Sequence, residues 1–245
     1  MAVEKVAFIT GGNKGLGLET ARQLGKQGIK VVIGARDLAK GKEAVEKLKA
    51  DGVNADVVRF DITKAADYKE IYQYFEKNYG RLDILINNAG ISKEDFMGGN
   101  KTSSTSGEVL HETFDTNFFG AVQSTQVLLP LIKKAPAGRI VNLSSILGSL
   151  ALHADPKSPI YDAKAFAYDA SKAALNSFTI HLAHELKGTK IKVNSAHPGW
   201  VKTDMGTDAA PMEIVDGAKT SVALATLPDD GPTGAYIHLG ETLPW

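Results

Sequence analysis

Tyr168 and Lys172 stand four residues apart in the stretch YDASK, within a segment of helical periodicity from Ala167 to Lys187. Residues four apart on a helix share one face, so the phenol and the ammonium can lie side by side. A free tyrosine titrates near pH ~10, and a neighbouring ammonium favours tyrosinate and lowers that pKa. Such a phenol can give a proton to a carbonyl oxygen during reduction or take one from an alcohol during oxidation. The spacing is also common on helix surfaces, so the pair alone does not establish a site.

Two other patterns in this region resemble sites but lack a required partner. Tyr161 begins the similar stretch YDAKA, but its fourth following residue is an alanine, so we do not expect it to act as an acid. His181 and His184 stand three residues apart beside Glu185, a spacing that could hold a metal ion. No third ligand is evident, so we interpret these histidines as helix surface or interface residues and expect no metal.

Four glycines lie close together near the start of the chain, in TGGNKGLG from Thr10 to Gly17, between a strand-like run and a helical one. Gly11 permits a tight turn, and Gly15 lets a pyrophosphate approach the free N–H groups at the helix N-terminus. Gly17 lets the helix pack closely on the strand. The alternative is a glycine-rich turn without a ligand, since the spacing differs from the common G-x-G-x-x-G fingerprint. The loop residues expected to contact a dinucleotide are Gly11, Asn13, Lys14, Gly15, Leu16 and Gly17.

The charges around this loop bear on the choice of nucleotide. The second strand-like run ends in GARD, where an NAD-binding protein usually places an acid for the ribose and an NADP-binding protein needs a cation for the 2′-phosphate. Arg36 occupies that place, and Lys14 can project toward the same point, which suits a phosphate dianion. Both could instead be solvated surface charges. We interpret Asp37 as the N-cap of the next helix; if it pointed at the ribose, NAD would be favoured.

Short β-branched runs alternate with longer amphipathic segments along the chain, which predicts an α/β fold. The predicted strands are Lys5–Thr10, Lys30–Ala35, Val53–Phe60, Leu82–Asn88, Gly138–Ser144, Lys190–Ala196 and Gly234–Leu239. The predicted helices are Leu16–Gln27, Asp37–Asp51, Ala65–Asn78, Glu112–Lys133, Ala167–Lys187 and Pro211–Ala225. The strands are nearly apolar, as expected when helices cover both faces of a parallel sheet. Without repeats or linkers, residues 1–245 are expected to form a single domain.

Three long loops are expected to carry a site, because loops past the strand ends of such sheets hold ligands. They are Ile91–His111, Ile146–Phe166 and His197–Pro211.

The composition excludes several classes of protein. Lys plus Arg and Asp plus Glu both number 28, so the chain lacks the basic excess of a duplex-binding protein and no nucleic acid partner is expected. No cysteine is present, which excludes thiol catalysis and fits a reducing, cytoplasmic compartment. No apolar run approaches the ~18 residues of a membrane span, so no membrane partner is expected.

Seven motifs follow one another in a fixed order. They are the glycine loop, Asp61 in RFDIT, NNAG at Asn87–Gly90, Asn117 in DTNFFG, VNLSS ending at Ser145, YDASK, and HPGWVKTDM from His197. This set, from Val3 to about Met205, resembles the short-chain dehydrogenase/reductase family. TGGNKGLG, ARD, TNFFG and PGWVKTDM together are most similar to its NADPH-dependent carbonyl reductases. The resemblance and the alternation of elements imply a Rossmann-type doubly wound parallel sheet of seven strands in the order 3-2-1-4-5-6-7.

The resemblance also implies roles for four catalytic residues. Tyr168 would exchange the proton, and Lys172 would assist it and bond the nicotinamide ribose. Ser145 would hold the substrate oxygen, and Asn117 would hold a water that links Lys172 to solvent. Ser144 competes with Ser145, but the family usually uses the second serine of this motif, so Ser145 is preferred.

Other residues are expected at an NADPH site on the same grounds. Asp61 and Asn88 resemble contacts to the adenine and its ribose, although a strand-end cap and a turn residue are the alternatives. His197 is expected near the nicotinamide end, and Thr203 resembles a contact to the carboxamide. The remaining members are Ile62, Ala89, Gly90, Pro198, Gly199 and Val201.

The expected function is reduction of a ketone or aldehyde to an alcohol with NADPH, so the partner is a small carbonyl or alcohol molecule. One alternative is a non-enzymatic NADP-binding regulatory protein, and another is an epimerase or dehydratase on the same fold. The interval from Ser145 to Tyr168 is longer than is usual in the family. In the carbonyl reductases that the chain resembles, a longer insertion at this point obstructs a helix-to-helix interface, so a monomer and a homo-oligomer both stay open.

Overall fold

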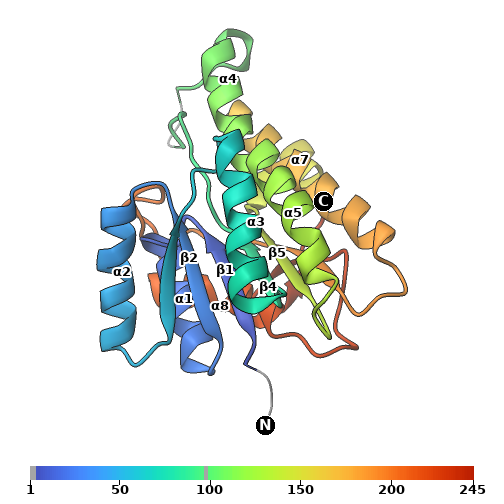
Figure 1. Cartoon of the computed structure of the whole chain (residues 1–245). Coiled ribbons are helices and arrows are strands. Elements are labelled where there is room, and N and C mark those ends of the chain that lie inside the picture. Colours follow the sequence, from blue (N-terminus) through green and yellow to red (C-terminus); the bar gives the residue numbers. More distant parts are fainter. Residues whose placement is uncertain (1–3, 97–98) are drawn as a thin grey trace.

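The computed structural model describes residues 4–96 and 99–245 (Figure 1). Residues 1–3 lie outside the described residues. The expected domain, from residue 1, and the family resemblance, from Val3, both begin there. Residues 97–98, inside the first predicted loop, also lie outside the described residues.

The strands form one sheet in the order β3-β2-β1-β4-β5-β6-β7-β8. Seven are parallel and confirm the predicted order: β1 (Val6–Thr10), β2 (Lys30–Ala35), β3 (Ala55–Arg59), β4 (Ile84–Asn87), β5 (Arg139–Leu143), β6 (Lys192–Ala196) and β7 (Tyr236–His238). The prediction of seven strands missed an eighth, β8 (Glu241–Thr242), which pairs antiparallel with β7. Leu239 and Gly240 form the connection, both with positive φ, as in a tight two-residue hairpin. The two residues of β8 are too few to show the alternating pattern by which a strand is recognised in a sequence.

Helices cover both faces of the sheet, and a separate apolar core lies between the sheet and the helices on each face. One core joins the sheet to α1 (Gly15–Lys26), α2 (Leu38–Ala50) and α8 (Ile214–Ala225). The other joins it to α3 (Ala65–Tyr79), α5 (Gly120–Ile132) and α7 (Phe166–Glu185). Figure 1 shows α3 and α5 in front of the sheet, with α1 and α8 behind it. This arrangement is the doubly wound fold that the sequence predicts.

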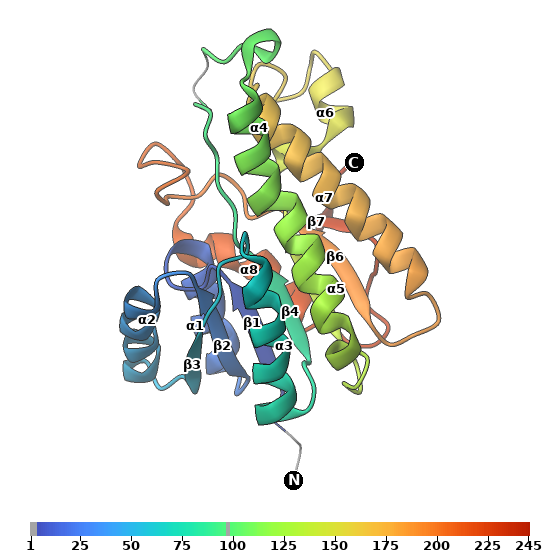
Figure 2. The same cartoon turned by 45° about the horizontal axis from the view of Figure 1, so that its top comes forward.

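Above the carboxyl ends of the strands stand α4 (Gly107–Phe114), α6 (Leu150–Ala154) and the start of α7 (Figure 2). The short helices η1 (Thr102–Ser104) and η3 (Ile146–Gly148) lie in the same connections. Two of the three predicted loops therefore contain helices. The helix α6 was missed because five residues span little more than one turn, too few to show periodicity.

The helix predicted over Glu112–Lys133 differs from the structure in its start and in its regularity. It begins earlier, at Gly107, because the Ser106 hydroxyl accepts a hydrogen bond of 3.2 Å from the Val109 N–H and caps the first turn. It is then interrupted by a π-helical turn, η2 (Asp115–Phe119), before α5. Such a turn places one extra residue in the helix, so the side chains beyond it face a different direction.

Among the residues that the structure describes, no helix is long and apolar enough to cross a membrane.

Candidate active site

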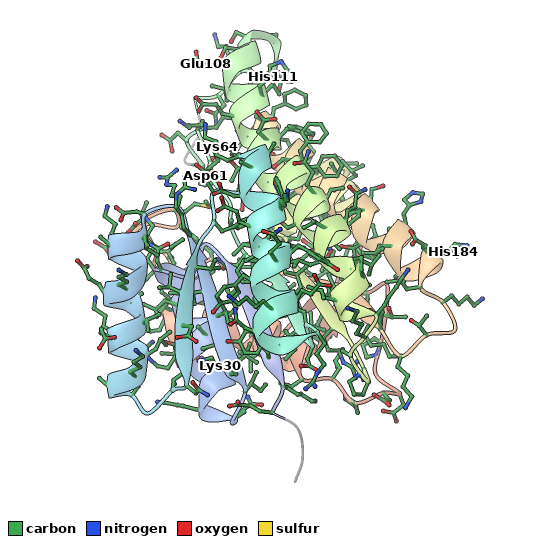
Figure 3. The ribbon with its side chains drawn as sticks, viewed as in Figure 1. Lys30, Asp61, Lys64, Glu108, His111 and His184 are labelled. Carbon is green, nitrogen blue, oxygen red and sulfur yellow. The ribbon has the colours of Figure 1, made fainter. Side chains whose placement is uncertain are left out.

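The predicted site residues follow the strands at one edge of the sheet. The glycine loop follows β1, Arg36 follows β2, Asp61 follows β3, Asn88 follows β4 and Ser145 follows β5. Parallel strands end at the same edge, so the fold brings these segments together. Figure 3 shows Asp61 at this upper edge, with Lys30, at the start of β2, at the opposite end. The helix α7 adds Tyr168 and Lys172 beside β5.

Tyr168 is buried, with 7% of its surface exposed, in the first turn of α7. Burial raises the pKa of Tyr168 to about 12, and the negative charge of Asp169 acts in the same direction. The neighbouring Ser145 hydroxyl opposes this rise but does not outweigh it. The two hydroxyls therefore face each other, and the phenol holds its proton at neutral pH.

Lys172 lies one turn along the same helix face, with 4% of its surface exposed. Its Nζ donates a hydrogen bond of 2.7 Å to the Leu143 carbonyl at the end of β5 and lies 5.5 Å from the centre of the Tyr168 ring. Burial lowers the pKa of Lys172 to about 8. The expectation that Lys172 would lower the Tyr168 pKa is wrong for this structure, because burial disfavours the charged form of both groups and dominates.

The two adjacent serines point to different neighbours. Ser145 is the N-cap of η3, and its Oγ accepts a hydrogen bond of 3.3 Å from the Leu147 N–H while lying near Tyr168. Ser144 is buried and lies beside the Tyr236 hydroxyl instead. Of the two serines, Ser145 is therefore the one whose hydroxyl lies near the Tyr168 phenol.

Asn117 lies in the π-helical turn η2 and is buried, with 1% of its surface exposed. Its Oδ1 accepts from the Ile91 N–H at 2.8 Å, and its Nδ2 donates to the Ile91 carbonyl at 2.9 Å and to Ser171 Oγ at 3.0 Å. The side chain thus holds the segment after β4 against α7. A Cβ added at Gly90 would lie 3.4 Å from Asn117 Oδ1 and 3.5 Å from Lys172 Nζ, so both catalytic candidates face this glycine.

The glycine loop has the shape expected of a dinucleotide cradle. Gly11 and Gly15 have φ of 63° and 58°, a backbone conformation that residues with side chains rarely adopt. A Cβ added at Gly15 would meet no atom within 4 Å. A Cβ at Gly17 would lie only 2.4 Å from Asn88 Nδ2, so only glycine fits there. The N-cap Lys14 makes no side-chain cap, which leaves the first N–H groups of α1 for an anion. Asn13 and Leu16 complete this open loop.

Asn88 supports the loop from the neighbouring strand. Its Nδ2 donates to the carbonyls of Thr10 and Gly11, at 2.8 and 3.2 Å. The structure therefore gives Asn88 a bracing contact in addition to the ribose contact that the resemblance implies. Ala89 packs against the turn, because a Cβ at Gly11 would come within 3.2 Å of the Ala89 Cα.

The candidate phosphate end holds Arg36 and Asp61. Arg36 is exposed after β2 and lies close enough to Asp61 to act on its carboxylate. Burial opposes ionisation of Asp61, but hydrogen bonds from Thr63 and the charges of Lys64 and Arg36 outweigh it and lower its pKa. Figure 3 shows Asp61 and Lys64 at this corner of the sheet. Ile62, the residue after Asp61, is buried. The Asp61 Oδ1 accepts from the Thr63 N–H and hydroxyl, at 3.0 and 2.8 Å, so Asp61 also caps the end of β3, as the alternative interpretation of this residue describes.

Two charged residues near this end have protein partners. The Asp37 carboxylate accepts from the N–H groups of Ala39 and Lys40, at 3.0 and 3.1 Å, which confirms its interpretation as an N-cap. Lys14 forms an ion pair, since its Nζ lies 2.5 Å from Asp204 Oδ2 in the loop after β6.

The loop after β6 forms the candidate nicotinamide end. His197 Nδ1 accepts from the N–H groups of Ile146 and Gly199, at 3.1 and 3.4 Å, and burial lowers its pKa to about 3, so the ring is neutral. The turn at Pro198 and Gly199 has a φ of 92° at the glycine, and Val201 bridges to Met212. The Thr203 hydroxyl donates to the Val201 carbonyl at 3.3 Å, which folds the loop back.

A model of the short chain dehydrogenase family matches residues 5–214. The chain belongs to the short-chain dehydrogenase family. It is 34% identical over 279 residues to the human (Homo sapiens) protein named carbonyl reductase (NADPH) 1, covering 98% of each chain. It is 31% identical over 297 residues to salutaridine reductase of Papaver somniferum, covering 97% of this chain and 95% of that protein.

Solved structures agree with these relatives. The crystal structure of an NADPH-bound carbonyl reductase from chicken fatty liver superposes with a TM-score of 0.85, at 26% identity over 99% of each chain. The structure of the Papaver somniferum salutaridine reductase superposes with a TM-score of 0.82, at 31% identity over 95% of this chain and 99% of that one. The likeness therefore extends along nearly the whole dehydrogenase.

Sequence reasoning missed four residues that touch the site of this dehydrogenase. Glu94 and Phe96 contact Tyr168, the Tyr236 hydroxyl donates to the backbone carbonyl of Ser145, and Asp204 contacts Lys14. Each partner is distant in the sequence, and none stands at a fixed spacing from it. The sequence therefore held no local signal for these contacts.

Other features of the dehydrogenase lie away from these residues. A cavity of about 510 Å³ is lined mostly by apolar residues, such as Leu224 of α8 and Ile237 of β7, together with Lys219 and Thr220, and by none of the four catalytic candidates. His181 and His184 are exposed on α7, and Figure 3 shows His184 on the outside of the helix.

Proposed function

We propose that this short-chain dehydrogenase reduces the carbonyl group of a ketone or aldehyde to an alcohol, with NADPH as its cofactor. The observation that carries the proposal is the pair of hydroxyls on Tyr168 and Ser145, which lie together beside the buried Lys172. The named relatives, carbonyl reductase and salutaridine reductase, support the same class of reaction.

The residues that would hold the cofactor fit its parts. The open glycine loop (Gly11–Gly17) and the uncapped start of α1 offer N–H groups to the pyrophosphate. Arg36 offers a guanidinium to the 2′-phosphate. Asp61 and Asn88 stand toward the adenosine end, and the segment from Pro198 to Thr203 toward the nicotinamide end. When bound, NADPH supplies the hydride that reduces the carbonyl carbon.

The protein's own groups would act on the carbonyl oxygen. The Ser145 hydroxyl donates a hydrogen bond to that oxygen and fixes its position. Negative charge grows on the oxygen as the carbon is reduced, and the Tyr168 phenol gives it a proton. Because the pKa of Tyr168 is raised to about 12, the phenol is protonated at neutral pH and suited to reduction more than to alcohol oxidation.

Lys172 and Asn117 would support this proton transfer. An ammonium beside the ring stabilises the tyrosinate that remains after the proton has left. Asn117 holds Ile91 and Ser171 in place around Lys172 and Tyr168, which favours a bracing role.

A screen of carbonyl compounds tests the function. Purified protein is mixed with NADPH or NADH and a panel of ketones and aldehydes, and cofactor oxidation and alcohol formation are measured. We expect turnover of at least one carbonyl, faster with NADPH. Binding of NADPH without any turnover would favour a regulatory protein instead, whereas tightly retained NAD would favour an epimerase or dehydratase.

Two expectations from the sequence complete the proposal. Residues 1–245 act as one domain, supported by the single sheet that carries all the candidate residues. The cysteine-free composition supports a cytoplasmic location.

A further inference from the structure

The segment from Gly90 to Phe96, which follows β4, touches three of the four catalytic candidates. Gly90 faces Lys172 and Asn117, and Ile91 exchanges two hydrogen bonds with Asn117. Further along, Glu94 and Phe96 both contact Tyr168. The same segment opens the first long loop of the site, so it connects that loop to the reacting groups.

Glu94 contacts the backbone of Tyr168. Its Oε2 accepts a hydrogen bond of 3.0 Å from the Tyr168 N–H, although 74 positions separate the two residues. Tyr168 lies in the first turn of α7, where N–H groups have no partner within the helix. The N-cap residue, Ala165, cannot supply one from its side chain. Glu94 therefore caps the turn that carries the candidate acid.

Phe96 contacts the Tyr168 ring. The two rings meet edge to face, with centres 5.0 Å apart and planes at 81°. This geometry is favourable for aromatic pairs. The segment thus holds Tyr168 at two points: the backbone through Glu94 and the ring through Phe96.

The Glu94 carboxylate lies in a cluster of titratable groups around the start of α7. Asp169 Oδ2 accepts from the Ala165 N–H at 3.0 Å and lies 3.4 Å from His153 Nε2, and Lys164 Nζ lies 3.0 Å from His153 Nδ1. Burial raises the pKa of Asp169 to about 7, and the charge of Glu94 adds to this rise. Two carboxyl groups thus meet at one helix end.

One oxygen of each carboxyl, Glu94 Oε1 and Asp169 Oδ1, is buried without a hydrogen-bond partner among the described residues. Leaving such atoms unpaired costs stability. Buried polar atoms that are left unpaired at a cost to stability are typical of functional sites, where local rules of packing are broken.

We propose that Glu94 is a positioning residue for the reaction. By capping the first turn of α7 from the loop after β4, it fixes the Tyr168 hydroxyl toward Ser145. This role rests on the proposed carbonyl reduction. In this role Glu94 acts through the Tyr168 backbone.

Two substitutions separate positioning from simple folding. Glu94→Ala removes the acceptor, and Glu94→Gln keeps an acceptor oxygen of nearly the same shape. Glu108→Ala is the matched control, because Glu108 is an exposed glutamate in the first turn of α4 (Figure 3). For each protein, kcat, the KM for NADPH, the thermal unfolding midpoint and the hydrogen exchange of the Tyr168 amide are measured.

We expect Glu94→Ala to lower kcat by ~10-fold or more with the KM for NADPH within about twofold, because a small misplacement of a reacting group slows the chemical step. The Tyr168 amide should exchange faster, and the protein should stay folded at the assay temperature. Glu94→Gln should recover most of kcat, and Glu108→Ala should match the wild type.

Two results would overturn the proposal in distinguishable ways. A fully active Glu94→Ala variant, or one whose loss lies wholly in the KM for NADPH, would overturn the positioning role alone. Failure of the wild-type protein to reduce any carbonyl would overturn the proposed function, and the positioning role with it.

Discussion

Lys14 Nζ lies 2.5 Å from Asp204 Oδ2, an ion pair that joins the glycine loop to the loop after β6. Both side chains are largely exposed, at 71% and 81%, so the pair contributes only ~0–1 kcal/mol. A phosphate dianion near Lys14 would compete with Asp204 for the ammonium.

Asp204→Asn should therefore strengthen NADPH binding. The substitution frees Lys14, so we expect the Kd for NADPH to fall by ~2–5-fold and the Kd for NADH to change little. Titration of each cofactor by fluorescence measures both constants. Asp208→Asn, at an exposed neighbouring position, is the control. An equal change for both cofactors would show that Lys14 does not meet the 2′-phosphate.

Arg36→Ala should weaken NADPH selectively. A charge-assisted contact to a phosphate contributes roughly 1.5–3 kcal/mol, so the KM for NADPH should rise by ~10-fold or more. The KM for NADH should stay nearly constant, because NADH has no 2′-phosphate. Initial rates with both cofactors test this. If the unmutated protein already uses NADH as well as NADPH, the phosphate site is wrong.

Tyr168→Phe removes only the acidic hydroxyl, so the fold should persist while turnover falls by ~10²-fold or more. Tyr161→Phe is the matched control, since Tyr161 is partly exposed on the neighbouring loop and should be dispensable. Steady-state rates and circular dichroism separate catalysis from folding. Turnover of Tyr168→Phe within a few-fold of the wild type would mean that another group donates the proton.

Asp169→Asn should stabilise the protein above neutral pH. Burial raises the pKa of Asp169 to about 7 in the folded protein, from a usual value of 3.8, so the folded state binds a proton more tightly. Wild-type stability from this group is complete at low pH and is lost as the pH rises from about 4 to about 7. An asparagine has no such proton to lose.

Unfolding by urea across this range measures the effect. The stability of Asp169→Asn relative to the wild type should increase by ~1–3 kcal/mol between the two ends of the window. The exposed Asp162→Asn should show no such trend. A constant difference across the range would place the proton elsewhere in the cluster with Glu94 and His153.

The positions of the seven parallel strands were predictable because apolar runs and glycines mark where each strand begins and ends, and their order followed from the family resemblance and the alternation of elements. The relation between Tyr168 and Lys172 was predictable for a similar reason, since a fixed spacing on a regular helix fixes a shared face. The N-cap at Asp37 depended on the same local chemistry.

Contacts between distant segments could not be predicted. Glu94 reaches Tyr168 only because the strands after which they follow are neighbours in the folded sheet. The Tyr168 pKa was predicted in the wrong direction, because the sequence shows the charge of Lys172 but not the burial that outweighs it. The π-helical turn around Asn117 also left no mark in the hydrophobic pattern.

The short antiparallel strand β8 closes one side of the sheet. An unpaired strand edge is a template onto which another chain can add, and long, flat, apolar edges are the most prone to such aggregation. Here the outermost strand has only two residues, both exposed, and one of them is the charged Glu241. A strand added from another chain would have few backbone groups to pair with and would have to bury the Glu241 carboxylate beside them. This border therefore offers little template for the growth of fibres from that side.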